Sequence, residues 1–133
     1  DLEALRMLHN EFPQAHLVAG KLNLEGEMAL VMRMDLMVVM DSFNMHMATL
    51  LGIPVLSIWG ATHHYSGFGP YGQGPEAIVE VPLEKLPCRP CSVFGNKPCS
   101  RGDLACLNWI QPAYVYRRLE ERLAEKRLRA QSA

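Results

Sequence analysis

The segment Leu36-Met-Val-Val-Met-Asp-Ser-Phe-Asn-Met-His46, followed by Pro54-Val-Leu-Ser-Ile-Trp59, decides the fold. Residues 36–40 form a continuous apolar run, which is typical of a parallel strand covered on both faces. Residues 44–51 have helical spacing and stop at Gly52, and residues 54–59 form a second apolar run that ends at Gly60. Strand, helix and strand with short connections predict a βαβ unit on a parallel sheet.

The alternation continues on both sides of this unit. We expect a helix over residues 2–12 closed by Pro13, a short strand at 16–19, a helix capped by Asn23, a strand at 77–81 and a helix over 112–129. Residues 61–75 and the Cys-rich stretch 87–106 have loop composition, and the charges of the last helix predict a solvated face. The fold class is therefore α/β, with a Rossmann-like parallel sheet flanked by helices.

Length and composition limit the class of protein. A chain of 133 residues with 49% hydrophobic and 20% charged residues predicts one globular domain, residues 1–133. The net charge of −1 gives no basic field for nucleic acid. No apolar run approaches the roughly 20 residues that span a bilayer, although peripheral membrane association stays open. Because the chain begins at Asp1 rather than Met, we expect a fragment or a processed form of a longer protein.

Polar side chains stand where the first buried strand should end. Ligands of open parallel sheets bind beyond the carboxyl ends of the strands, and Asp41, Ser42 and His46 occupy such an end. A helix that starts near Ser42 offers free N–H groups to a phosphate. The alternative is a routine helix cap with a structural histidine. The chain has neither Gly-x-Gly-x-x-Gly nor a Walker-type loop, which argues against dinucleotide oxidoreductases and P-loop ATPases.

Several short motifs occur together in one order. They are Gly20-Lys-Leu-Asn-Leu24, Asp41-Ser-x-x-Met-His46, Leu51-Gly-Ile-Pro54, Trp59-Gly-Ala-Thr62 and Cys88-x-x-Cys91 with Cys99 and Cys106. This ensemble, from about residue 17 to 112, closely resembles the C-terminal domain of the ADP-heptose:lipopolysaccharide heptosyltransferase family. The resemblance implies one half of a GT-B glycosyltransferase, whose C-terminal domain holds the ADP-sugar donor.

The resemblance also implies a reaction and its location. Transfer to a lipopolysaccharide core would be metal-independent and inverting, in the cytoplasm or at the inner face of the inner membrane. The acceptor site and the general base would come from an N-terminal domain. We therefore expect no catalytic residue in this chain, and no transfer activity from the chain alone.

Matched position by position, the resemblance implies six donor-binding residues. Asp41 corresponds to the acid near the donor sugar, Ser42 and the Phe43 backbone to the diphosphate-binding turn, and His46 to the histidine that follows. Leu22 would cover the adenine, and Thr62 would lie beside the cleft with His63. Phe43 stands where the family usually has Gly, so its ring is expected to narrow the site.

The four cysteines predict a second, structural feature. A Cys-x-x-Cys pair followed by two more thiols can hold a tetrahedral zinc ion, with Cys88, Cys91, Cys99 and Cys106 as ligands. Free thiols or disulfides are the alternatives. The adjacent His63 and His64 could bind a metal, but without a carboxylate beside them in the sequence they are expected to face solvent.

Two other functions stay open from the sequence. The domain could bind a nucleotide or nucleotide sugar without transferring it, or it could be a structural zinc-bearing interaction domain. Nucleotide binding separates the first two functions from the third.

Overall fold

The computed structural model describes residues 2–131, without the side chains of residues 129 and 130. The chain divides into two compact units, Asp1–Leu30 and Val31–Ala133, and each is described by itself. That residues 1–133 form one nucleotide-sugar-binding domain stays a prediction.

The first unit contains the first helix expected from the sequence and the second helix up to Leu30. Helix α1 (Leu2–Glu11) ends just before Pro13, which has no amide hydrogen for a further helical bond. Helix α2 (Leu24–Val31) begins after Asn23, whose side-chain Oδ1 accepts a 2.9 Å hydrogen bond from the Gly26 amide. Asn23 therefore caps α2 as predicted.

The strand predicted at residues 16–19 is wrong. Residues 16–18 have no regular structure, and the Lys21 amide donates to the Val18 carbonyl at 2.9 Å, which closes a turn. A strand requires a hydrogen-bonded neighbour, and none of the described strands pairs with this segment. The short apolar run was too weak a signal without a partner.

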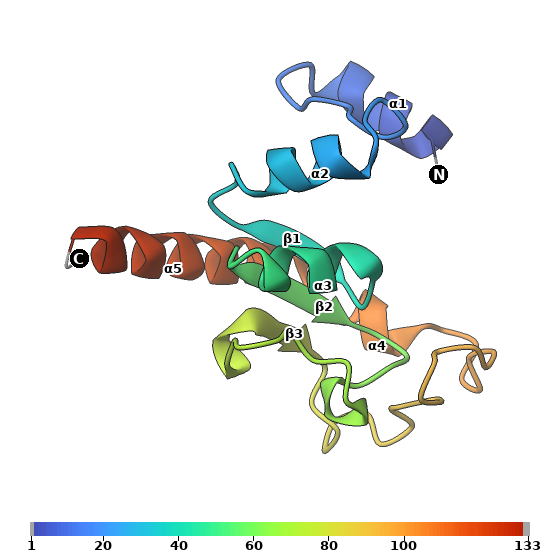
Figure 1. Cartoon of the computed structure of the whole chain (residues 1–133). Coiled ribbons are helices and arrows are strands. Elements are labelled where there is room, and N and C mark those ends of the chain that lie inside the picture. Colours follow the sequence, from blue (N-terminus) through green and yellow to red (C-terminus); the bar gives the residue numbers. More distant parts are fainter. Residues whose placement is uncertain (1, 132–133) are drawn as a thin grey trace. The chain divides into compact units, whose positions relative to one another are not determined.

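The second unit is built on a three-stranded parallel sheet in the order β1-β2-β3 (Figure 1). Strand β1 (Met37–Met40) pairs with β2 (Val55–Trp59), and β2 pairs with β3 (Ile78–Glu80). Helix α3 (Phe43–Leu50) connects β1 to β2 and ends before Gly52, which has a φ of +75°. The predicted βαβ unit and the third strand are confirmed.

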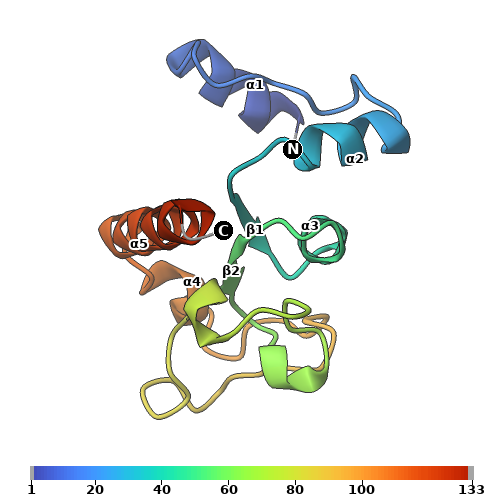
Figure 2. The ribbon, with the colours of Figure 1, turned by 60° about the vertical axis from the view of Figure 1, so that its left-hand side comes forward.

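Helices cover both faces of this sheet. Helix α3 lies on one face and the long helix α5 (Pro112–Gln131) on the other (Figure 2). Between β2 and β3 the chain forms only the 3-10 turns η1 (His64–Ser66) and η2 (Pro75–Ala77). The short helix α4 (Ala105–Asn108) precedes α5. The core contains Val31, Val39, Met45, Met47, Ala48, Ile53, Val55, Trp59 and Ala77.

Strand β1 is less covered than predicted. Val39 is buried against the α3 side, whereas Val38 and Met40 are about half exposed. The expectation of cover on both faces is wrong because β1 is an edge strand of the described sheet and α5 packs against β2.

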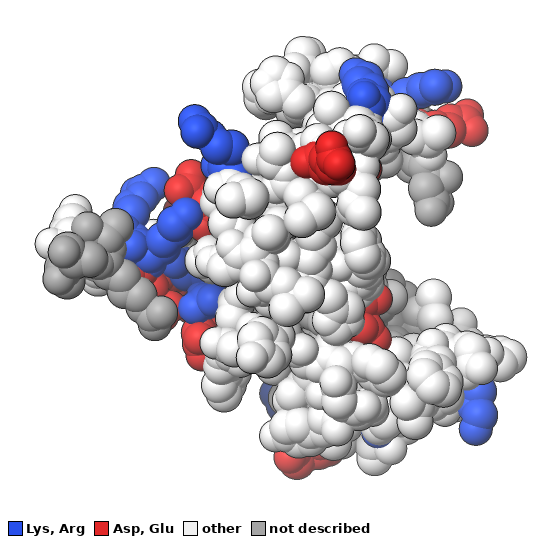
Figure 3. Space-filling model, in the orientation of Figure 1, with Lys and Arg blue, Asp and Glu red and all other residues white. Residues whose placement is uncertain are grey.

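The charged face of α5 also differs from the expectation. Charged side chains do gather along this helix (Figure 3), but Arg122 is only 7% exposed. Its Nη2 donates to Gln73 Oε1 at 3.0 Å, and its Nη1 lies 3.1 Å from Glu125 Oε2. The same Gln73 oxygen accepts from the Val55 amide at 3.0 Å, and Gln73 Nε2 donates to the Ile53 carbonyl at 2.9 Å. These contacts attach α5 to the start of β2.

No helix among residues 2–131 is both long enough and apolar enough to cross a membrane.

Candidate functional site

The carboxyl end of β1 leads directly into the first turn of α3. Ser42 has extended backbone angles (φ −157°, ψ 165°) and occupies the N-cap position. Its carbonyl accepts hydrogen bonds from the amides of Met45 (3.1 Å) and His46 (3.4 Å). Its hydroxyl makes no capping hydrogen bond. The backbone of Ser42 therefore performs the cap, and the hydroxyl stays available to a ligand.

The neighbouring polar side chains are also unused. Within residues 2–131, the side chains of Asp41 and His46 form no hydrogen bond or ion pair, and both residues are half-buried. Phe43 is 63% exposed at the first position of α3. The first N–H groups of a helix have no acceptor within the helix. This edge therefore combines free backbone donors, a hydroxyl, a carboxylate and an imidazole.

Two hollows of the second unit lie away from this edge. Two hollows of about 520 and 480 Å³ lie beside Glu80 and Tyr114. Neither of them is lined by Asp41, Ser42 or His46.

Thr62 is held in place at the end of the neighbouring strand. It is half-buried, and its carbonyl accepts a hydrogen bond from Arg89 Nη2 at 3.1 Å. Its methyl group lies close to Gly95, where an added Cβ would be 3.0 Å from Thr62 Cγ2. The Cys-rich loop therefore packs directly on the loop that follows β2.

The histidine pair is not solvent-facing, which corrects the sequence-based expectation. His63 is 3% exposed, and His64 is half-buried. The fold supplies the carboxylate that the local sequence lacks, because Glu80 at the end of β3 lies 3.6 Å from His63 Nε2 and 3.4 Å from His64 Nδ1. The two imidazole rings stack with centroids 4.4 Å apart.

Burial controls the protonation of His63. Desolvation lowers the pKa of His63, while the nearby Glu80 carboxylate acts in the opposite direction. The charges of His64 and Arg89 lower it further. The Tyr65 amide donates to His63 Nδ1 at 3.2 Å, which makes Nδ1 the acceptor and leaves the proton of the neutral ring on Nε2, toward Glu80.

Arg89 is the residue that sequence reasoning missed. Its side chain is fully buried, and its guanidinium donates to the carbonyls of Gly60 (2.6 Å), Thr62 (3.1 Å) and Val81. It also donates to Glu80 Oε2 at 3.1 Å. Arg89 thus joins the ends of β2 and β3. Arg89 lies between Cys88 and Cys91 in the sequence, and this Cys-x-x-Cys motif predicts a role for the thiols but none for the arginine.

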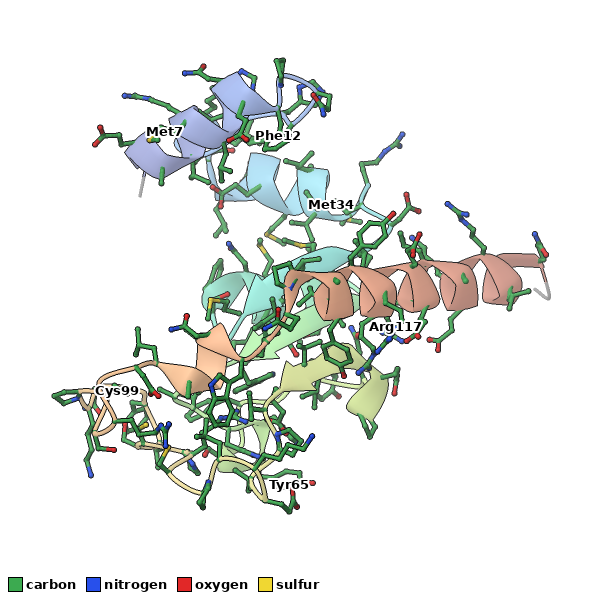
Figure 4. The ribbon with its side chains drawn as sticks, turned by 180° about the vertical axis from the view of Figure 1, so that it is seen from behind. Met7, Phe12, Met34, Tyr65, Cys99 and Arg117 are labelled. Carbon is green, nitrogen blue, oxygen red and sulfur yellow. The ribbon has the colours of Figure 1, made fainter. Side chains whose placement is uncertain are left out.

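The four cysteines are free thiols around one loop, and Cys99 lies in the part that leads toward α4 (Figure 4). Backbone N–H groups, that of Leu104 first, lower the pKa of the Cys99 thiol. Burial raises the pKa of the Cys106 thiol. Among the described residues, the one group of three metal-ligating side chains whose ligand atoms converge is His63, His64 and Glu80. Zinc at the cysteines therefore stays a prediction.

The structure brings five of the six predicted donor-binding residues into the second unit. Asp41, Ser42, Phe43 and His46 follow β1, and Thr62 follows the adjacent β2. Leu22 belongs to the first unit, so its contact with a base stays a prediction.

Comparison with known families identifies the chain. The model of glycosyltransferase family 9 (heptosyltransferase) matches residues 1–95, which is more than half of the chain. The chain belongs to this family. The matched part of this family 9 glycosyltransferase contains all six predicted donor-binding residues, Cys88 and Cys91, whereas Cys99 and Cys106 lie beyond it. No curated protein and no solved structure matches the chain.

Proposed function

We propose that this chain is the donor-binding part of a glycosyltransferase that transfers a heptose, or a related sugar, from an ADP-sugar to a lipopolysaccharide core. The observation that carries the proposal is the unused polar edge after β1. The Ser42 hydroxyl, the Asp41 carboxylate and the His46 imidazole have no partner within the described chain, beside the N-terminus of α3. Family membership supplies the reaction class.

Each group has a role in this proposal. The first N–H groups of α3 and the Ser42 hydroxyl donate to the diphosphate, where negative charge grows as the leaving group departs. Asp41 accepts hydrogen bonds from donor sugar hydroxyls, and His46 donates to a phosphate oxygen. Thr62 borders the sugar.

The proposed transfer is inverting and needs no metal. The acceptor hydroxyl oxygen forms a bond to the anomeric carbon, the bond from that carbon to the diphosphate oxygen breaks, and ADP leaves from the opposite side. The hydroxyl proton goes to a general base on a second domain, which faces the open edge of this one. The 133-residue chain by itself then binds the donor without transferring its sugar. The reaction is placed in the cytoplasm, with the acceptor at the inner face of the inner membrane.

Calorimetric titration of the 133-residue chain with ADP, ADP-heptose and UDP tests the proposal. We expect both adenine nucleotides to bind more tightly than UDP. Losing one hydrogen bond to a charged phosphate costs about 1.5–3 kcal/mol, so Ser42→Ala and His46→Ala should weaken ADP binding by at least tenfold. Asp41→Asn should weaken ADP-heptose more than ADP, because its partner is the sugar.

Matched variants elsewhere serve as controls. Asp35→Asn and His16→Ala change exposed residues outside this edge and should leave binding unchanged. If the site variants bind ADP as well as the controls do, the site is misassigned. Measurable sugar transfer by the 133-residue chain would contradict the proposed role of a second domain.

A further inference from the structure

We propose that Cys88, Cys91, Cys99 and Cys106 bind Zn²⁺, or a similar soft divalent ion, through four thiolates in tetrahedral geometry. In this proposal Arg89 connects the site to the loop after β2, so that ion binding orders that loop as well. The first part is independent of the proposed function. The second part rests on it, because that loop carries Thr62.

The four cysteines span 19 residues of chain, and the fold brings the segments that carry them together. Cys88 and Cys106 pack on the same small apolar cluster, with Val81, Leu86 and Ala105. The Gly102 amide donates to the Cys99 carbonyl at 3.2 Å, so a turn leads from Cys99 toward α4, which contains Cys106. Cys91 Sγ contacts the Cys88 carbonyl at 3.7 Å, as expected for a tight Cys-x-x-Cys turn.

The surroundings suit a site of high negative charge. Four thiolates around one divalent ion carry a net charge of −2, which needs nearby donors and cations. The fully buried Arg89 guanidinium belongs to the Cys88–Cys91 turn, and Arg101 follows Cys99 by two residues. These cations supply part of the outer shell that such a site needs.

Ion binding requires the thiols to move closer together. No three of the described cysteine sulfurs converge in the way that the ligand atoms of His63, His64 and Glu80 do. Cys88, Cys91 and Cys99 lie between β3 and α4, where the chain has no helix or strand, and Cys106 lies in α4. Rotation about side-chain bonds and adjustment of this loop can therefore complete the site.

The His63, His64 and Glu80 group is the weaker metal site, although its atoms already converge. The Tyr65 amide donates to His63 Nδ1, so His63 Nε2 carries a proton and cannot bind a cation in this tautomer. The Arg89 guanidinium already contacts Glu80 at 3.1 Å and would repel a second cation. A soft divalent ion therefore selects the thiols.

Arg89 connects the thiol loop to the sheet. It stands between two of the ligands, and its buried side chain bonds to the carbonyls of Gly60 and Thr62. In addition, the Cys91 amide donates to the Ala61 carbonyl at 2.8 Å. Every residue from Gly60 to Thr62 is thus hydrogen bonded to the Cys88–Cys91 turn. An ion that orders this turn orders the loop after β2 as well.

Cobalt(II) substitution tests the metal site directly. The reduced, metal-free 133-residue chain is titrated with Co²⁺, and we expect sulfur-to-cobalt charge-transfer absorption together with intense visible bands of a tetrahedral ion. One equivalent of Zn²⁺ should displace the Co²⁺ and remove these absorption bands. Tetrahedral visible bands without the sulfur absorption would assign the ion to the histidines and overturn the proposal, as would the absence of any binding.

Variants identify the ligands. Cys99→Ser changes a partly exposed loop residue, and we expect it to weaken Co²⁺ binding by more than the roughly 10–100-fold that loss of an outer-shell partner costs. Ser100→Ala and His64→Ala should leave the spectrum unchanged. Circular dichroism of metal-free Cys99→Ser should match that of metal-free wild type, which separates ligand loss from misfolding. Unchanged cobalt affinity in Cys99→Ser would overturn the assignment.

Hydrogen exchange tests the proposed connection between the metal site and the loop after β2. We expect Zn²⁺ to slow amide exchange in a peptide covering residues 60–66 of wild type, and to slow it less in Arg89→Met. Zinc binding without any change in this peptide would overturn the connection. Neither the cobalt titration nor the exchange measurement uses a nucleotide. Their outcomes therefore do not depend on whether calorimetry supports the donor-site proposal.

Discussion

The carboxylate of Glu80 faces three basic side chains, those of His63, His64 and Arg89, which come from two different loops. Each of these three residues lies at least 9 positions from Glu80 in the sequence, so no local motif predicts the cluster. The chemistry of the site after β1 is different, because Asp41, Ser42 and His46 lie within six residues of one another. The first group is bonded internally, whereas the side chains of the second form no hydrogen bond or ion pair with the described residues.

The lowered pKa of His63 predicts a loss of stability in acid. The unfolded chain takes up this proton first as the pH falls below about 6.5, the ordinary histidine pKa, so stability decreases from there toward the lower folded-state pKa. We expect the urea midpoint of wild type to fall more than that of His63→Gln between about pH 7 and about pH 5. His16→Gln, at an exposed position, should follow wild type. Parallel curves for all three proteins would contradict the assignment.

Phe43 predicts a change in donor affinity, provided that the proposed site is correct. Its ring stands at the first position of α3, beside the proposed diphosphate-binding turn. Phe43→Gly keeps the N–H group and removes the ring, so we expect ADP to bind more tightly, by up to about tenfold or 1.4 kcal/mol. Leu50→Gly, at the exposed far end of the same helix, controls for the loss of helix propensity. Weaker ADP binding in Phe43→Gly alone would show that the ring contributes a contact.

At the scale of elements, polar side chains fix the positions of helices and strands relative to one another more precisely than apolar packing alone would. Gln73 receives hydrogen bonds from Val55 at the start of β2 and from Arg122 of α5, and it donates to the Ile53 carbonyl. Arg89 does the same at the other end of β2. Both residues belong to loops, so the loops fix the sheet at its two ends.

Gln73→Met should destabilise the sheet. The substitution keeps the size of the side chain but leaves the Val55 amide, the Ile53 carbonyl and the buried Arg122 guanidinium each without one partner. We expect the free energy of unfolding in urea to fall by about 1–3 kcal/mol. Gln111→Met changes an exposed glutamine of the same unit and should cost less than about 0.5 kcal/mol. Equal midpoints for the two variants would contradict the bridging role.

At the scale of the whole molecule, burial is confined to the second unit. Every buried hydrophobic residue of the described chain lies at or after Val31, whereas α1 buries none of its side chains. The stability of the sheet is therefore expected to depend on the elements from β1 to α5.

Deletion of residues 1–22 tests this division and leaves the Asn23 cap of α2 in place. We expect cooperative urea unfolding, followed by circular dichroism, with a free energy within about 1 kcal/mol of the full chain. A chain that ends at Gln111 lacks α5 and the Arg122 contacts, and it should lose the cooperative transition. Loss of cooperativity in the first deletion would contradict the separation of the two units.

The sequence by itself determined the parallel βαβ unit, because residues 36–59 carry local signals for each element: apolar runs, a helical spacing and Gly52 as a stop. It also placed Asp41, Ser42 and His46 just after the first strand of this unit, because they follow that strand directly in the chain. Only the tertiary structure decided that His63 is buried, that Arg89 joins two strand ends and that residues 16–19 form no strand. Those outcomes depend on partners up to 29 residues away, as for Arg89 and Gly60, and local propensity contains no information about such partners.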